Sequence, residues 1–517
     1  MLTRRDVIKK AVISTVGIAT VGVLGACTAQ PNNNENNPVE NDDNNTLSFD
    51  KEADVVIVGG GGAGVTAALQ ASSDGASVLI LEKTDKHGGT TNLSGGVMQA
   101  AGTDVQKANS NYKDDTPEKH YQYWLKAGEG YLDEELVKDL AYTAPEHIQW
   151  LTNLGLKFNS IYGHNHIPYI EDDLFADRIH VYEGGGLGGT GNILVNTMLD
   201  AALAKQAVIE YNTSVTNLIT NEAGVVIGVL AEQNGREIKV KAKKGVILAT
   251  ASVDSNPEMA KLLNPQQYWS ITTQVNVCSP ANTGDGIRMA MDIGASVVAS
   301  GGTIDFCGKT GIATDNRIPV FPYFNVNKAG RRFVCEDATY AYTYRAIYQQ
   351  EKQFDAPTYM IFGKSSLAAE GSPWTEESVE QDVASGAVLR ADTIEALADL
   401  IKVEPQNLTA TLSTWNSDAK AGADLQFDRK MGVQEITGPF YAYKNTAFNL
   451  GAITGVKINT DGQVIKANGS VIPRLYASGL TAGGWIGPYY PGSGTAIIGL
   501  VHWGRKAGAH AAKLDSI

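Results

Sequence analysis

The sequence predicts an α/β fold built on a Rossmann-like dinucleotide-binding domain, and three observations support this prediction. Residues 55–58 form a short apolar run of the kind that makes a buried parallel strand. The motif G-x-G-x-x-G follows at once as Gly59, Gly61 and Gly64, ahead of a segment with helical spacing. A second apolar strand ends in Glu82, 18 positions after Gly64. This order is typical of a site that binds a pyrophosphate at a helix N-terminus and a ribose hydroxyl at the acid.

The first 50 residues are expected to lie outside this folded part. Residues 1–27 contain the pair Arg4-Arg5 and then an uncharged apolar run that is shorter than the ~20 residues of a membrane-spanning helix. The run ends at Cys27 and resembles a bacterial lipoprotein signal of the twin-arginine export type, although an uncleaved membrane anchor is an alternative. We therefore expect an extracytoplasmic protein anchored to the cell membrane by lipid on Cys27. Residues 28–50, rich in Asn, Asp and Glu, are expected to be a disordered linker.

Charge and cysteine content exclude several classes of protein. The formal net charge of -14, without a basic patch, argues against a nucleic-acid partner. The remaining cysteines, Cys278, Cys307 and Cys335, form no C-x-x-C motif, so metal clusters, disulfide scaffolds and attached haem are not expected. His164 and His166 are expected to form a polar loop, because no third ligand motif accompanies them.

The segment that follows Glu82 distinguishes between possible dinucleotides. The sequence EKTDKHGGTTNLSGG (82–96) resembles the FAD-binding segment of the fumarate reductase and 3-ketosteroid dehydrogenase flavoprotein superfamily. Segments 188–199, 243–252, 283–295 and 471–479 agree with it, so that the resemblance covers residues 51–517. It implies noncovalent FAD, bound by Gly59, Gly61, Gly62, Ala63, Gly64, Glu82, Lys83, Gly89, Thr90, Thr91, Asn92, Gly95, Gly96, Asp285, Gly479, Ala496 and Ile497.

The same resemblance implies an inserted domain. Residues 303–447 are expected to form an α+β capping domain between two parts of the FAD-binding domain, 51–302 and 448–517. Within the insert, 324–346 is predicted to be a hairpin-like pair of strands followed by a helix. Residues 391–429 have the apolar spacing of amphipathic helices.

Three further motifs separate ketone chemistry from carboxylate chemistry. Tyr340 follows Glu336 in E-x-x-x-Y, residues 450–455 read L-G-x-x-x-G, and Tyr490 begins Y-P-G-x-G, which ends at Gly494. All three resemble 3-ketosteroid dehydrogenases, and the two tyrosines stand where fumarate reductases have arginines. The resemblance implies that the Tyr490 hydroxyl and the Gly494 N–H bind a ketone oxygen, while Tyr340 transfers a proton at the neighbouring carbon.

The sequence gives two further expectations for tyrosines near the active site. Another active-site tyrosine is expected from residues 158–172, either Tyr162 or Tyr169. Tyr489, next to Tyr490, is expected only to pack.

The function implied is that of an FAD-dependent oxidoreductase acting on the C–C bond beside a ketone. The favoured reaction is reduction of an α,β-unsaturated, steroid-like ketone, with hydride from flavin N5 and a proton from Tyr340. Reduction is favoured because a phenol with a pKa of about 10 is mostly protonated at neutral pH and can donate that proton. A membrane quinol or a flavin-linked protein is the expected electron donor.

Three alternatives remain open. One is a fumarate- or acrylate-type reductase in which Arg345 or Arg317 binds the carboxylate. Another is the same site running oxidatively as a ketosteroid dehydrogenase. A lipoprotein that only transfers electrons or binds solutes is disfavoured, because it needs neither the cap nor phenols at the flavin.

Overall fold

A computed structural model describes residues 48–164, 166–273, 275–307 and 321–517 of the chain. The signal segment 1–27, the linker as far as residue 47, and Arg317 lie outside these ranges. The last linker position, Asp50, already belongs to the folded body, because its backbone N–H donates to the Lys239 carbonyl at 2.9 Å.

The main sheet contains the predicted parallel strands. It has eight strands in the order β19-β20-β9-β1-β2-β6, with β7 and β8 extending from β9. Strand β1 pairs in parallel with β2 and β9, and Val56 lies opposite both Leu79 and Val246. The central strands are buried on both faces, which explains their continuous apolar runs. The strand bounds are β1 Lys51–Val58, β2 Val78–Leu81, β6 Val208–Glu210, β7 Thr213–Thr220, β8 Val226–Gln233, β9 Arg236–Leu248, β19 Gln463–Ile465 and β20 Val471–Ala477.

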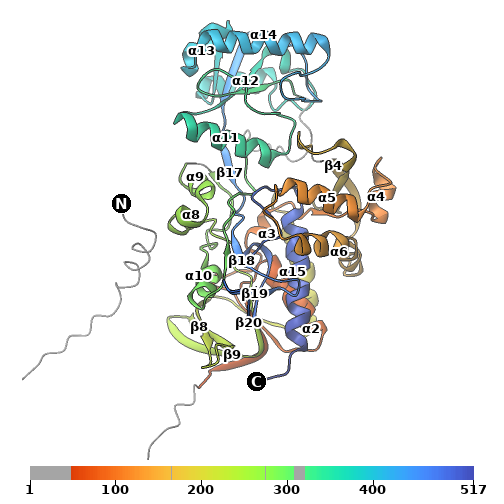
Figure 1. Cartoon of the computed structure of the whole chain (residues 1–517), viewed down its shortest axis with the longest axis vertical. Coiled ribbons are helices and arrows are strands. Elements are labelled where there is room, and N and C mark those ends of the chain that lie inside the picture. Colours follow the sequence, from red (N-terminus) through yellow and green to blue (C-terminus); the bar gives the residue numbers. More distant parts are fainter. Residues whose placement is uncertain (1–47, 165, 274, 308–320) are drawn as a thin grey trace, which may run out of the picture. The chain divides into compact units, whose positions relative to one another are not determined.

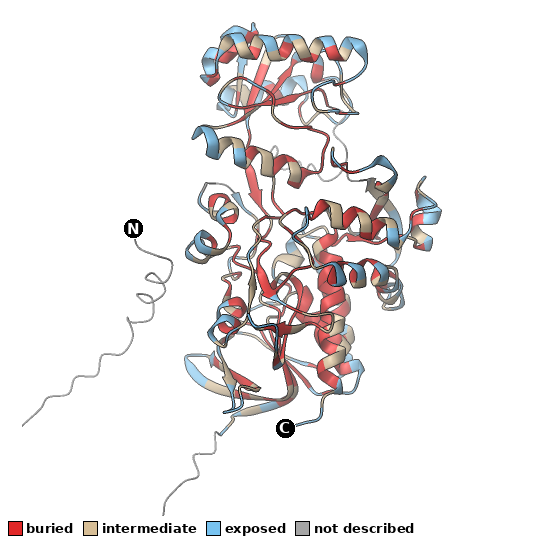
Figure 2. Cartoon of the chain, in the orientation of Figure 1, coloured by how far each residue is buried: buried red, intermediate tan, exposed pale blue. Residues whose placement is uncertain are grey.

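Helices from both ends of the chain cover this sheet. Helix α2 (Gly62–Ser73) packs along α15 (Thr495–Lys513), as Figure 1 shows, and α7 (Gly191–Ala204) packs against α2. Most residues of both helices are buried, and α15 is mostly red in Figure 2. The C-terminal helix thereby lies beside the glycine motif at the start of the fold.

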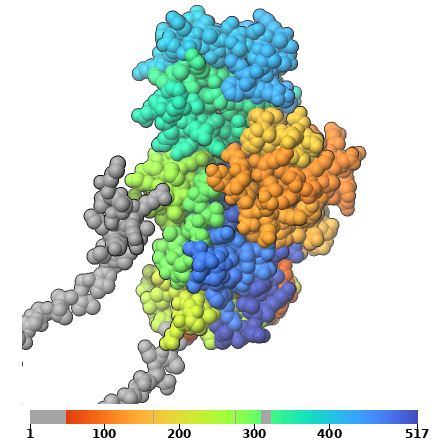
Figure 3. All heavy atoms as spheres, in the orientation of Figure 1, coloured from red at the N-terminus to blue at the C-terminus, as the bar shows by residue number. Residues whose placement is uncertain are grey.

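A second group of elements lies between α2 and α7 in the sequence. It comprises α3 (Gly89–Leu93), α4 (Asp104–Asn109), α5 (Pro117–Ala127), α6 (Glu134–Asn153) and a small sheet of β3 (Met98–Gln99), β4 (Phe158–His164) and β5 (Asp177–Tyr182). The Asp133 N–H donates to the Gly484 carbonyl at 2.8 Å. Figure 3 shows this orange part of the surface against the blue C-terminal part, so distant segments of the sequence meet here.

Short elements connect the main sheet with the segment that follows it. They are α8 (Pro257–Leu263), α9 (Pro265–Thr273), α10 (Asp285–Asp292), β10 (Val275–Asn276), β11 (Val297–Val298), β12 (Phe306–Cys307), β17 (Ala447–Asn449), β18 (Gly455–Lys457) and β21 (Ala482–Gly483). Strand β17 pairs with β10 and β12, and β18 pairs with β11 and β21.

Residues 321–444 contain a separate four-stranded antiparallel sheet with its own apolar clusters. Its strands are β13 (Phe324–Val326), β14 (Tyr359–Gly363), β16 (Phe440–Lys444) and β15 (Val388–Ala391). Its helices are α11 (Tyr340–Phe354), α12 (Glu376–Ser385), α13 (Ile394–Ile401) and α14 (Pro405–Ala421). Buried side chains such as Leu397 and Trp415 form one cluster, and Phe362 and Trp374 belong to another. This segment is α+β in content, and its closure over a cofactor stays a prediction.

The predicted pair of strands in 324–346 is wrong in one respect. Only β13 is a strand, and its return is limited to a single bridge between Val326 and Arg332. At this bridge the buried Arg332 guanidinium forms ion pairs with Glu336 (2.5 Å) and Asp424 (2.7 Å), so side-chain contacts rather than a continuing strand ladder hold residue 332. Helix α11 follows as expected, and α13 and α14 confirm the amphipathic helices of 391–429.

Within the described ranges, the structure contains no helix that is both long enough and apolar enough to span a membrane.

Candidate functional site

A cavity of about 610 Å³ lies at the carboxyl ends of β1, β2 and β9, the position where open α/β sheets bind ligands. Its volume is in the range of cofactor and ligand sites. All the residues predicted to bind FAD line it except Gly64 and Asn92, and so do the predicted substrate residues Tyr162, Tyr340, Tyr490 and Gly494. Gly64 packs beneath the turn, and the Asn92 side chain donates to the His87 carbonyl at 3.0 Å, so these two shape the loops around the cavity.

The glycine motif forms a tight turn that opens the N-terminus of α2 toward the cavity. A Cβ on Gly64 would lie 2.0 Å from the Gly59 carbonyl oxygen, so no larger residue fits there. Gly61 caps the helix without a side-chain hydrogen bond. The first N–H groups of a helix have no partner within it and attract anions. This cradle fits the pyrophosphate of a dinucleotide.

Glu82 is fixed at the rim of the same cavity. Its Oε2 accepts a hydrogen bond from the Gly60 N–H at 2.7 Å, and its Oε1 accepts from the Thr84 N–H at 2.8 Å. An ionised carboxylate has further lone pairs that can accept from ribose hydroxyls. Lys83 and Asp285, both predicted at the cofactor, also line the cavity and form an ion pair with each other at 2.7 Å.

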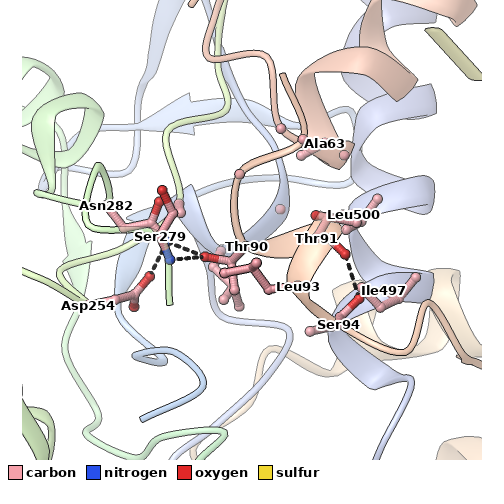
Figure 4. Close-up of a pocket in the computed structure, with 18 of the residues that line it drawn as sticks. Ala63, Thr90, Thr91, Leu93, Ser94, Asp254, Ser279, Asn282, Ile497 and Leu500 are labelled. Atoms are coloured by element: carbon pink, nitrogen blue, oxygen red, sulfur yellow. Dashed lines mark hydrogen bonds between the residues drawn. The ribbon is translucent and has the colours of Figure 1, made fainter. Parts of the chain in front are cut away.

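A partly buried polar network holds the first turn of α3. Figure 4 shows Thr90 facing Ser279 and Asn282, whose backbone N–H and side-chain Nδ2 donate to Thr90 Oγ1 at 2.9 and 2.8 Å. Asn282 also donates to Asp254 at 2.7 Å. Burial raises the pKa of Asp254 to about 6, while hydrogen bonds such as that from the Ala452 N–H oppose the rise. Sequence reasoning missed Asp254 and Asn282, since they belong to no motif.

Tyr490 and Gly494 lie together at the end of the cavity that also contains Tyr340. The rings of Tyr340 and Tyr490 are 6.1 Å apart, and Tyr490 Oη accepts a hydrogen bond from the Ala496 N–H at 3.1 Å. Burial raises the pKa of Tyr490 to about 12, so this phenol stays protonated well above neutral pH. The Gly494 N–H has no acceptor among the described residues. The site therefore offers two hydrogen-bond donors in a buried setting.

Gly494 itself requires glycine. Its φ is +88°, and a Cβ would lie 2.9 Å from the Met98 and Gln99 backbone. Its N–H is thus held at the first turn of α15 by tight packing against β3.

The structure distinguishes between the two early tyrosines. Tyr162 lies on β4, opposite Ile179 of β5, and lines the cavity. Tyr169 comes after that strand, is 47% exposed, and donates to Glu129 at 3.3 Å. Tyr489 packs as expected, buried and hydrogen-bonded to Thr339.

Arg345 lies away from the cavity lining, as far as the described residues show it. Its guanidinium forms a two-pronged ion pair with Glu129, at 3.0 and 2.9 Å. Near the phenols the wall is instead apolar, made by Ile304, Phe306 and Leu450. The Phe306 ring packs edge-on to Tyr340 with 6.2 Å between centroids. Ile304 and Phe306 were not predicted, because a short apolar stretch in the sequence does not distinguish a cavity wall from any other buried loop.

Comparison with known proteins identifies the family to which this chain belongs. A family model described as an FAD binding domain matches residues 54–497. Digoxin reductase of Eggerthella lenta is 31% identical, over 99% of this chain and 97% of its own length. A cytochrome-type fumarate reductase of Shewanella frigidimarina is 29% identical, over 87% of this chain and 75% of its own.

A solved structure is similar over most of the fold. It is the 3-ketosteroid-Δ4-(5α)-dehydrogenase of Rhodococcus jostii RHA1 in complex with 4-androstene-3,17-dione. The TM-score is 0.76 at 28% identity, covering 91% of this chain and 99% of that one.

Proposed function

Because the chain belongs to the FAD binding domain family and is an FAD-dependent oxidoreductase acting on CH–CH groups, we propose that it reduces the C=C bond of an α,β-unsaturated ketone with an apolar, steroid-like body. The observation that carries this proposal is the pair of donors, the Tyr490 hydroxyl and the Gly494 N–H, in a cavity that also contains Tyr340. Relatives with this fold act on several kinds of unsaturated substrate, so the similarity alone does not identify the substrate of this chain.

The cavity residues fit FAD. The α2 N-terminus would hold its pyrophosphate, Glu82 a ribose, and the Thr90 loop the flavin end. When bound, FAD supplies the hydride for the β-carbon of the substrate.

The protein's own groups supply the rest of the chemistry. Hydride addition places negative charge on the ketone oxygen, where Tyr490 and Gly494 donate hydrogen bonds. Tyr340 gives its proton to the α-carbon, which completes the reduction. Phe306, Ile304 and Leu450 pack against the apolar body of the substrate and exclude water from this end.

Two alternatives differ in substrate or direction. A conjugated carboxylate is favoured by the likeness to fumarate reductase, yet Arg345 would first have to leave its ion pair with Glu129. The other candidate, Arg317, lies outside the described residues.

Oxidation of a saturated ketosteroid would use the same phenols, but would need a phenolate as base. An ordinary phenol has a pKa of about 10, so at neutral pH the site favours reduction.

The cellular setting is a further part of the proposal. We place the enzyme outside the cytoplasmic membrane, attached through lipid on Cys27 and supplied with electrons by a membrane quinol or a flavin-linked protein. Two or more acyl chains are needed for stable attachment. Incorporation of labelled palmitate into the wild type and its loss in Cys27→Ala test the anchor; an unlabelled wild type would contradict it.

The substrate class is tested with the reduced flavoprotein. Anaerobic, dithionite-reduced enzyme is mixed with 4-androstene-3,17-dione, fumarate, urocanate or cinnamate, and flavin reoxidation is followed by absorbance. We expect the enone to reoxidise the flavin at least about tenfold faster than the carboxylates, a difference of about 1.4 kcal/mol in barrier. Faster reoxidation by fumarate or another carboxylate would overturn the proposal.

A further inference from the structure

Three chemically different ligand groups meet beside the start of α11. They are a ring nitrogen of His166, Cys335 Sγ and a carboxylate oxygen of Asp337, and all lie within 4.8 Å of one another. The three side chains are buried, with His166 only 7% exposed. His166 is far from Cys335 and Asp337 in the sequence, which is why the histidine pair 164 and 166 predicted only a polar loop.

His166 Nε2 is buried and has no hydrogen-bond partner among the described residues. An unpaired buried nitrogen costs free energy unless a ligand or water satisfies it. Cys335 and Asp337, by contrast, contact each other, with the thiol donating to Asp337 Oδ1 at 2.9 Å. The cluster thus has an unsatisfied ring nitrogen next to a thiol and a carboxylate.

From this arrangement we propose that His166, Cys335 and Asp337 bind one divalent transition-metal ion of the zinc type. Nitrogen and thiolate ligands favour zinc and its neighbours over magnesium or calcium, which prefer all-oxygen sites. In a tetrahedral zinc site the ligand atoms lie about 3.3–3.8 Å apart, so small side-chain rotations from the present spacing suffice. The fourth position is left for water.

The surroundings suit a cation that enters from solvent. Asp172 and Asp428 interact electrostatically with His166, and together with Asp337 they outnumber the positive charge of Lys430, which also acts on it. Lys430, whose backbone N–H donates to Asp337 Oδ2 at 2.7 Å, is exposed, so the cluster lies close beneath the surface. On binding, the Cys335 thiol releases its proton to solvent, and the thiolate and the Asp337 carboxylate together balance the charge of the ion.

The site joins two segments that carry predicted active-site phenols. The Thr339 N–H donates to the His166 carbonyl at 2.9 Å, and Thr339 directly precedes Tyr340 at the start of α11. His166 in turn follows β4, which carries Tyr162. A bound ion would therefore fix the relative position of both segments, and this role is independent of which substrate the enzyme uses.

The test measures zinc directly on the FAD-loaded full chain. Protein stripped with a chelator is dialysed against buffered Zn²⁺, and zinc per flavin is determined by mass spectrometry. We expect one ion per chain in the wild type and in Cys278→Ser, a buried cysteine outside the cluster. His166→Gln and Cys335→Ser should each weaken binding at least about 100-fold, since loss of a supporting outer group alone costs 10–100-fold.

A wild-type measurement keeps the test decisive if the variants lose FAD. Zinc addition in weakly buffered solution should release about one proton per ion, and the thermal midpoint should rise with zinc concentration. A wild type that takes up no stoichiometric zinc overturns the proposal. Equal zinc affinity in the wild type and both ligand variants overturns it as well.

Discussion

Replacing Tyr340 by phenylalanine tests the proposed proton donor with the smallest possible change. Tyr340 is 8% exposed, and the centroid of its ring lies 6.2 Å from that of Phe306 and 6.1 Å from that of Tyr490. Phenylalanine keeps both contacts and removes only the hydroxyl. General acid catalysis contributes ~10²–10⁴ in rate, so the barrier to protonation should rise by about 3–5 kcal/mol while FAD stays bound.

The assay is single-turnover reoxidation of the reduced flavin by an enone, in H₂O and in D₂O. Tyr348→Phe is the matched control, because it lies on the same helix, half-buried, and does not line the cavity. We expect the control to stay within about threefold of the wild type and to keep its solvent isotope effect. If Tyr340→Phe also stays within about threefold with the isotope effect unchanged, the proton comes from another group and the reasoning fails.

Three other perturbations test separate parts of the site. Tyr490→Phe should lower kcat/KM for an enone at least about tenfold, because one donor of the pair is lost, and an unchanged kcat/KM would exclude Tyr490 from substrate binding. Gly64→Ala places a Cβ 2.0 Å from the Gly59 carbonyl oxygen and should abolish FAD retention after desalting, and retention equal to that of the wild type would contradict the tight turn. The pKa of Asp254, about 6 in the folded protein, is raised, so the unfolded chain ionises first as pH increases and stability falls between about pH 4 and pH 6. In urea unfolding, Asp254→Asn should therefore gain up to about 3 kcal/mol relative to the wild type from pH 4 to pH 7, and no gain would contradict the raised pKa.

The sequence by itself determined the dinucleotide fold, because its evidence is local. A buried strand, a turn that only glycine can form, and an acid at the end of the next strand all lie within residues 55–82. Each constrains the backbone at its own position, whatever the rest of the chain does. The Y-P-G-x-G loop is equally local, and its Tyr490 and Gly494 do line the cavity.

Other features of the site could be decided only by the tertiary structure. Tyr162 and Tyr169 are alike in the sequence, but the pairing of β4 with β5 leaves Tyr162 at the cavity and Tyr169 at the surface. Likewise, only the folded chain shows that Arg345, a candidate carboxylate ligand, is paired with Glu129.

The polar groups that were not predicted also come together only in the tertiary structure. Asn282 donates to both Thr90 and Asp254, and Cys335 lies near His166, across long stretches of chain. Backbone turns and strand pairing obey short-range sterics, which the order of residues reveals. Which side chains satisfy one another in the interior depends on packing between segments that are distant in sequence, and that packing is a property of the whole fold.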